Sequence, residues 1–589
     1  MRHAILVTAI AVGVTTISTH GYAQTPRPKW TPALERAVQA EDPGRPMAAW
    51  VFFTDKGRDL ARRLAKAEDN LTPRARKRRL RNRGAGNLVD RYDVPVEPRY
   101  VRQVAATAVH IRQTSRWLNA VSVDATPEAL RRLSGLSCVE KLDVVRHGRV
   151  PQPEISEETA RPPRASSGPQ VVAYGPSFTQ NDQINVPMLH DLGFNGNGVM
   201  ICMLDAGFNN LGHTALDHLD ILATRDFVNG DSIVSDQPGQ MGSGNHGTWT
   251  LSTIGGFEPG QLIGPAWGAT YLLAKTENTS WERHVEEDAW IAGAEWGDSI
   301  GTDIISSSLG YLDGFTSPDP DYTWSDMDGN TTIVTIGADI AAGRGILVVN
   351  SAGNNALAPP GTNSLIGPAD GDSVLAVGAI TNTGVRAGFS STGPTADGRI
   401  KPDVMAMGQA VHVASAADPV GFLDLNGTSF SCPLVAGAAA LMLEVNPSVT
   451  NMEIIGALRS TADNAASPDS LVGWGIIDVH AAAFSTVTGI DDRSVPRREV
   501  ALYPAFPNPF NPTTTLRYEL PQSSHVVLTV YNVRGERVTT LVNEPQSRGF
   551  KSVVWNGTDR FGNKVSSGLY IYRLQAGDFE TSRKMMLLK

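Results

Sequence analysis

The chain has 589 residues, a length that excludes a single hydrophobic core and predicts about three or four folded units. With 41% hydrophobic and 19% charged residues, it has the composition of a globular protein and not of a disordered one. The formal net charge of −9 is unevenly divided along the chain. Residues 24–170 hold 28 Lys and Arg against 17 Asp and Glu (net +11), residues 171–490 hold 8 against 34 (net −26), and residues 491–589 hold 14 against 9 (net +5). We therefore expect the basic first unit to dock electrostatically on the acidic second unit.

The N-terminus has the pattern of a secretory signal. Arg2 precedes an apolar stretch over residues 4–17, and small residues precede Gln24. The stretch is shorter than a membrane span, and the alternative interpretation is a buried N-terminal helix. We predict a signal peptide over residues 1–23 and a protein that is secreted or displayed at the cell surface after export through the periplasm.

Residues 24–170 are predicted to form a small α+β unit followed by a linker. Strands are expected at 48–53, 118–123 and 139–145, and a helix begins at Pro127, where the first turn tolerates proline. Residues 56–83 are predicted to form one basic helix. Residues 151–168, rich in Pro, Glu, Arg and Ser, are typical of an exposed processing segment.

Basic side chains are concentrated between Arg74 and Arg83. Such a run suggests nucleic-acid binding, but it contains no interleaved aromatic residue and belongs to a chain predicted to be exported. We favour a solvated basic helix that faces the acidic unit, and we expect no nucleic-acid partner.

Residues 171–490 have the pattern of a doubly wound parallel α/β sheet. Apolar runs that alternate with helical stretches predict buried strands. These runs are residues 199–204, 271–274, 304–306, 346–350 and 374–377. Such sheets place their functional groups at the carboxyl ends of the strands.

Four polar residues stand next to these apolar segments. Asp205 and Asn354 follow predicted strands, His246 lies in a Gly-rich segment, and Ser429 precedes an apolar helix over 434–441. A serine hydroxyl at a helix N-terminus can attack a carbonyl when a base is near and N–H groups receive the oxyanion. The alternative for the serine alone is an ordinary helix cap.

The sequences around these residues resemble the subtilisin-like serine peptidases, or subtilases, over roughly residues 171–486. The matching segments, in chain order, are Asp205-Ala206-Gly207, His246-Gly247-Thr248, Ala352-Gly353-Asn354 and Gly427-Thr428-Ser429. Two departures are Ala206, where the family usually has Thr or Ser, and Trp249, where many members have His.

The resemblance implies a role for each site residue. Ser429 is the nucleophile, His246 the general base and Asp205 the group that orients the imidazole. Asn354 and the backbone N–H of Ser429 would bind the oxyanion. Two edges would pair with the substrate backbone, and they consist of Ser308, Leu309, Gly310, Ser351, Ala352 and Gly353.

The resemblance therefore implies a serine endopeptidase that hydrolyses proteins and peptides through an acyl-enzyme. The chemistry requires no cofactor; structural calcium is compatible with the family, and no metal ligands are assigned. Residues 119–145 resemble the family's propeptide, which implies a precursor inhibited by its own N-terminal unit. The alternative is a catalytically silent surface adhesion or binding protein on a peptidase scaffold. The presence of a suitable residue at all four catalytic positions argues against this alternative.

The C-terminal unit is predicted to begin at residue 503, after a linker over 491–502. Hydrophobic residues recur with a period of two at 526–532 and 568–574, which predicts the strands of an Ig-like β-sandwich. The segments 506–512, 555–557 and 584–589 resemble C-terminal sorting domains of the type IX secretion system, which implies that the secretion machinery is a partner. A generic Ig-like adhesion or substrate-binding module is the alternative.

The chain has three cysteines, and an odd number gives no disulfide framework. Cys202 and Cys432 lie in apolar runs, and Cys138 lies in a different unit. We predict that they are small buried hydrophobic residues.

Overall fold

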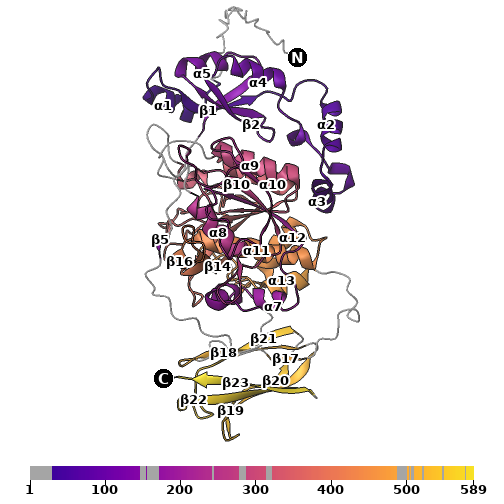
Figure 1. The fold of residues 1–589 in the computed structure, drawn as a ribbon, viewed down its shortest axis with the longest axis vertical. Coiled ribbons are helices and arrows are strands. Elements are labelled where there is room, and N and C mark those ends of the chain that lie inside the picture. The colour runs from indigo at the N-terminus through magenta and orange to yellow at the C-terminus, as the bar shows by residue number, and fades with distance from the viewer. Residues whose placement is uncertain are drawn as a thin grey trace, which may run out of the picture.

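The structure is a computed structural model that describes residues 29–145, 154–155, 172–241, 244–277, 287–312, 322–486, 500–502, 505, 510–520, 523–546, 549–577 and 579–588. The predicted signal peptide and most of both predicted linkers lie outside these residues. Figure 1 shows the three units in chain order, coloured from indigo to yellow.

The N-terminal unit is an antiparallel four-stranded sheet with helices on one face. The strand order is β2-β3-β1-β4. The strands are β1 (Met47–Phe53), β2 (His110–Ser115), β3 (Ala120–Ala125) and β4 (Val139–Val144), and the helices are α1 (Pro32–Ala40), α4 (Pro98–Ala105) and α5 (Pro127–Ser134). All three helices have proline in the first turn, and Thr126 caps α5 by accepting a hydrogen bond from the N–H of Ala129.

The basic segment forms two helices, α2 (Leu60–Asp69) and α3 (Pro73–Arg83), so the prediction of one continuous helix was wrong. The break has a local cause. Pro73 lacks the N–H that a continuing helix needs, and the hydroxyl of Thr72 instead caps the new helix at the N–H of Ala75.

The central unit is built on a seven-stranded sheet in which every pair is parallel. The strand order β14-β13-β12-β11-β6-β10-β7 consists of β14 (Val404–Met407), β13 (Val374–Ile380), β12 (Leu347–Ser351), β11 (Ile304–Ser307), β6 (Met200–Asp205), β10 (Thr270–Lys275) and β7 (Asp220–Asp226). The five predicted strands and the predicted fold class are confirmed. Consecutive strands are added first on one side of β6 and then on the other, so the carboxyl ends of β6 and β11 flank the switch point.

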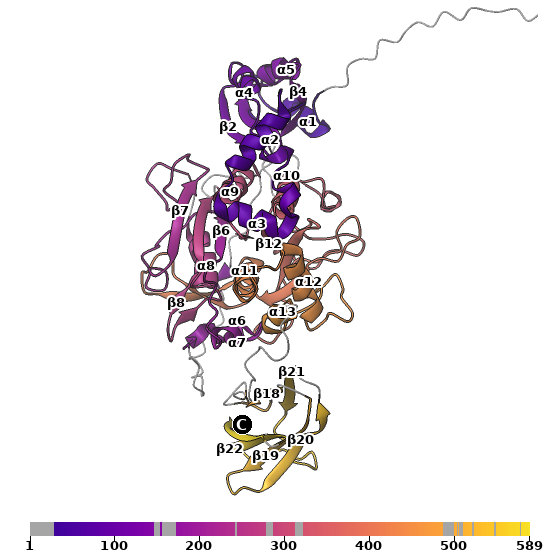
Figure 2. The ribbon, with the colours of Figure 1, turned by 90° about the vertical axis from the view of Figure 1, so that its right-hand side faces the viewer.

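Helices cover both faces of this sheet (Figures 1 and 2). One face carries α8 (Asn245–Gly255), α11 (Thr428–Val445), α12 (Asn451–Thr461) and α13 (Val479–Ser485), and the other carries α9 (Glu287–Ile300) and α10 (Ile333–Gly343). Among the described residues, α11 alone has the length and hydropathy of a membrane-spanning helix. It is 89% buried, as a core helix is.

Strand β1 contributes to two hydrophobic cores at once. Alternate residues, among them Ala49 and Val51, face the helices of the N-terminal unit. The residues between them, including Trp50 and Phe52, belong to the same cluster as α9 and α10 of the central unit. Because successive side chains of a strand point to opposite faces, one strand joins the two units through continuous apolar packing.

The C-terminal unit is a sandwich of two antiparallel sheets, as predicted. One contains β17 (Ala501–Leu502), β18 (Thr514–Leu520) and β21 (Gly549–Trp555), and the other contains β20 (Arg537–Gln546), β19 (Ser524–Asn532), β22 (Gly568–Ala576) and β23 (Phe579–Leu587). Leu516, Leu528, Trp555 and Tyr572 are buried between them.

Candidate active site

Asp205 and His246 are brought into direct contact at the carboxyl end of β6. The Nδ1 atom of His246 lies 2.6 Å from Oδ1 of Asp205, which is fully buried. The same Oδ1 accepts the N–H of Ala206 at 2.7 Å. The bond to the carboxylate places the ring proton on Nδ1 and leaves the lone pair on Nε2. Among the described residues, this buried Nε2 has no hydrogen-bond partner.

A glycine makes this contact possible. His246 lies in the first turn of α8, and Gly247 follows it. A Cβ at position 247 would lie 2.1 Å from the carbonyl oxygen of Gly207, in the turn after β6. Only glycine therefore allows α8 to approach the end of β6 closely enough for the imidazole to reach Asp205.

Thr250 completes the surroundings of the carboxylate and was missed by the sequence analysis. Its hydroxyl donates to Oδ2 of Asp205 at 2.9 Å, and the residue is fully buried. Ala206 has no hydroxyl to offer, so the second carboxylate oxygen receives its donor from α8. Thr250 lies four residues after His246, and that spacing places both on one helix face.

Ser429 lies in the first turn of α11, two residues after Gly427. Gly427 has φ +154°, a backbone conformation that favours glycine. In the described part of the chain, the N–H of Ser429 has no recorded partner. The hydroxyl donates to the carbonyl of Ser308 at 3.4 Å, and no hydrogen bond joins it to His246. The structure therefore brings Asp205 to His246 but leaves the serine hydroxyl turned to a neighbouring carbonyl.

Pro433 lies in the second turn of α11, which begins at Thr428. Its missing N–H is the one that would pair with the carbonyl of Ser429. That carbonyl accepts the hydroxyl of Ser308 instead, at 2.8 Å. Ser308 thus replaces the helix bond that proline removes, and it fixes the backbone of Ser429 from the end of β11.

Asn354 is oriented with its amide nitrogen free. Its Oδ1 accepts both the N–H and the hydroxyl of Thr428, each at 2.9 Å. Its Nδ2 has no recorded partner among the described residues. Two open donors, this amide and the N–H of Ser429, therefore both lie next to Thr428.

The two predicted substrate edges differ in how many of their backbone groups are already paired. Ala352 donates its N–H to Val377, and Gly353 donates to the hydroxyl of Thr428 and accepts from Ser391. By contrast, no backbone hydrogen bond within the described residues uses the N–H or carbonyl of Gly310. Within residues 308–310, the open backbone is therefore that of Gly310, because the carbonyls of Ser308 and Leu309 accept the Ser429 hydroxyl and Asn350 Nδ2. Residues 351–353 form a fixed wall.

The cysteines are free thiols, as predicted. Burial raises the pKa of Cys432 to about 12, and its Sγ contacts the carbonyls of Ser307 and Val349 at 3.4 Å. A protonated thiol held between backbone carbonyls is a packing group and not a nucleophile.

The described residues contain no group of three or more His, Cys, Asp or Glu side chains that could hold a metal ion. Asp326 and Asp328 accept hydrogen bonds from N–H groups of their own turns.

Comparison with known proteins agrees with this architecture. The profile described as "Subtilase family" matches residues 196–475. Subtilisin of Bacillus pumilus is 34% identical over 319 residues, which are 53% of this chain and 99% of that protein. The chain belongs to the subtilase family. Subtilisin E of Bacillus subtilis is 33% identical over 53% of this chain and 72% of its own length, and Subtilisin Savinase of Lederbergia lenta is 31% identical over 51% and 96%.

Family matches also cover the two flanking units. Residues 48–160 match the "Peptidase S8 propeptide domain, Bacteroidota", and residues 510–578 match the "FlgD Ig-like domain". This subtilase is therefore a serine endopeptidase made as a precursor, with an N-terminal propeptide, a peptidase domain and an Ig-like C-terminal domain.

Proposed function

We propose that Asp205, His246 and Ser429 form the catalytic triad of this endopeptidase. The observation that carries the proposal is the short bond between His246 and Asp205, which leaves a buried, unpartnered Nε2 as a base. The Ser429 hydroxyl leaves the carbonyl of Ser308 by rotation of its side chain and turns to Nε2 when substrate binds. Catalytic hydrogen bonds often tighten only in the complex with substrate.

In the proposed reaction, Ser429 Oγ attacks the scissile carbonyl while His246 Nε2 takes its proton. The oxyanion receives hydrogen bonds from Asn354 Nδ2 and the Ser429 N–H, the two open donors described above. His246 then gives the proton to the leaving amine, and water hydrolyses the acyl-enzyme by the same route in reverse. The extended substrate pairs with the edge of Ser308, Leu309 and Gly310, in which the backbone of Gly310 has no partner among the described residues, against the wall of Ser351, Ala352 and Gly353.

A fluorophosphonate probe tests the assignment. We expect covalent label on Ser429 of the processed enzyme and loss of both label and proteolysis in Ser429→Ala. Ser431→Ala is the matched control, because that serine is buried on the same helix and, within the described residues, its hydroxyl bonds only the carbonyl of Thr428. Label on another residue, or none on an active preparation, would refute the assignment.

We also propose that the precursor inhibits itself by means of the chain that follows the four-stranded sheet of the propeptide. Strand β5 (Glu154–Ile155) pairs with residues 425 and 426 of β16 (Phe422–Asn426), three residues before Ser429. This contact supports the proposal because it brings the connecting chain next to the nucleophile. Purified Ser429→Ala precursor should remain uncleaved, and cleavage of it without added protease would contradict self-processing.

The cellular route of the protein is a further part of the proposal. Residues 1–23 would direct export to the periplasm, and residues 503–589 would carry the protein across the outer membrane by the type IX system. The sequence segments quoted above support this, together with the Ig-like match. In a host with that system, deletion of residues 503–589 should leave the protein in the periplasm. Unchanged appearance in the medium would refute the sorting role.

A further inference from the structure

Helix α3 of the propeptide lies against the peptidase domain at the amino ends of the central strands, opposite to the active site. Its partners lie at Gly198, at residues 300–303 and at residues 344–346, which precede β6, β11 and β12. Figure 2 shows α2 and α3 running down from the propeptide along the domain. Since all these strands are parallel, their amino ends lie here, and their carboxyl ends hold Asp205 and Ser308.

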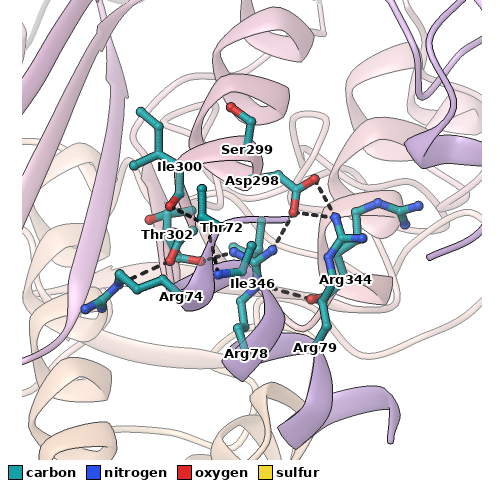
Figure 3. Close-up of polar contacts among 12 residues, drawn as sticks. Thr72, Arg74, Arg78, Arg79, Asp298, Ser299, Ile300, Thr302, Arg344 and Ile346 are labelled. Atoms are coloured by element: carbon teal, nitrogen blue, oxygen red, sulfur yellow. Dashed lines mark hydrogen bonds and ion pairs between the residues drawn. The ribbon is translucent and has the colours of Figure 1, made fainter. Parts of the chain in front are cut away.

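Arg78 is the centre of this contact (Figure 3). Its side chain is fully buried, and each of its nitrogens donates to a different acceptor. Nε donates to the carbonyl of Arg344 at 3.1 Å, Nη1 to the carbonyl of Thr302 at 2.5 Å, and Nη2 to the carboxylate of Asp298. These three acceptors, which we call the arginine pocket, come from separate elements of the peptidase domain and match the fork of a guanidinium.

The Asp298 carboxylate is shared by further arginines of the propeptide. Arg79 donates to both of its oxygens, at 3.0 and 2.9 Å, and Arg116 donates at 3.0 Å. Burial alone would raise the pKa of Asp298, but Arg78, Arg79 and Arg116 outweigh it and hold the pKa well below its ordinary value. The carboxylate is therefore ionised whenever the propeptide is bound.

The helix is consequently not the solvated basic helix that its sequence suggested. It faces the acidic domain as expected, but Arg78 and Arg79 are each only 1% exposed. Buried charges remain only where partners replace their water, and removal of one partner is strongly destabilising. The contact also satisfies carbonyls at the carboxyl ends of two helices, α9 and α10, where cations are favoured.

We propose that the arginine pocket is a binding site for a guanidinium-bearing helix, which retains the propeptide after the chain between the two domains has been cut. The site acts independently of whatever occupies the active site, because it lies at the other end of the sheet. The rate at which the cut propeptide leaves is then set by the α3 contact at the amino end of the sheet. This inference rests on the propeptide match and on the contacts, not on the proposed catalytic roles.

The test uses the full chain with Ser429→Ala and a recognition sequence for a site-specific protease inserted between Arg161 and Gly168. After the added protease has cut, the protein is immobilised through a C-terminal tag and release of the propeptide is followed with time. We expect Arg78→Ala to release the propeptide at least about tenfold faster than its parent. Lys77→Ala, which removes an exposed charge from the same helix, should release it at the parent rate.

Two further measurements keep the test decisive. If Arg78→Ala does not fold, Arg78→Lys takes its place, and it too should release faster, since an ammonium cannot reproduce the three-way fork. A saturating peptide substrate should leave the propeptide of the parent bound. The proposal would be overturned if that peptide released the propeptide of the parent, or if the Arg78 and Lys77 variants released their propeptides at equal rates.

Discussion

The two ends of the central sheet differ in how their functional polar groups are hydrogen-bonded. At the carboxyl end, His246 Nε2, Asn354 Nδ2 and the Ser429 N–H have no recorded partner within the described residues. At the amino end, each nitrogen of Arg78 has an acceptor and Asp298 receives three arginines, although Nε of Arg79 and Nε of Arg344 have no partner among the described residues. Unsatisfied buried groups cost free energy, and at the carboxyl end a bound substrate would supply the missing partners. One end is arranged for a substrate, and the other for a segment of the same chain.

The largest effect is expected when an open donor is removed. Asn354→Ala should lower kcat by about 10²–10³-fold with little change in KM, because the donor acts on the oxyanion and not on the bound substrate. Steady-state kinetics on a peptide substrate measure this. Asn355→Ala, next to it and exposed, is the control. A kcat within threefold of the parent would remove Asn354 from the oxyanion site.

Thr250 tests whether the carboxyl end depends on partners behind the reacting groups. Thr250→Val should reduce kcat about 10- to 100-fold, since a hydrogen bond to a charged group contributes about 1.5–3 kcal/mol. Thr250→Ser, which keeps the hydroxyl, should retain most of the activity. Thr253→Val is the matched control, because its hydroxyl bonds only the carbonyl of Trp249 within α8. Equal losses in the two valine variants would indicate a packing effect.

The bond from Ser308 to Ser429 predicts a stability effect and its rescue. Ser308→Ala should destabilise the protein by about 1–3 kcal/mol, because Pro433 cannot supply the missing donor to the Ser429 carbonyl. Adding Pro433→Ala restores an N–H at that position and should recover part of the loss. Denaturant unfolding in a Ser429→Ala background avoids self-digestion. A double variant no more stable than Ser308→Ala would contradict this account.

The smallest effect concerns an acidic pair near the amino end of β13. Burial and the neighbouring Asp372 raise the pKa of Asp339 to about 7. The folded state then binds this proton more tightly than the unfolded state, so stability falls as pH rises through about 7. Asp339→Asn removes that loss. At pH 8 the variant should gain about 1 kcal/mol in the free energy of unfolding, which corresponds to a rise of about 2–4 °C in Tm, and at pH 4 its Tm should change little. Equal shifts at both pH values would contradict the pKa as the cause.

Much of the fold was predictable because its signals are local. Apolar runs located five of the seven central strands, and short motifs placed Asp205 and His246 where the structure has them in contact. Strand β7 was missed because it is half-exposed and contains Asp220, Arg225 and Asp226 in a seven-residue strand. Its edge position, which no local pattern encodes, explains that composition.

The remaining features depend on residues far apart in sequence. Arg78 and Asp298 are 220 positions apart, and a buried arginine has the same one-letter pattern as a solvated one. The charge division predicted docking but not which arginines would be buried. The role of Thr250 could have been predicted from the sequence, since Thr250 lies one helical turn from His246. The pairing of Ser308 with the Ser429 carbonyl, which Pro433 leaves without a helix donor, could be found only from the fold.

Strand β1 links the release of the propeptide to its fate. The face that carries Trp50 and Phe52 is covered only while α9 and α10 lie against it. A liberated propeptide displays that aromatic stripe to water and loses the apolar burial that it shared with its partner. We expect the released propeptide to be less stable than the bound one, and its digestion by the freed endopeptidase would make activation irreversible.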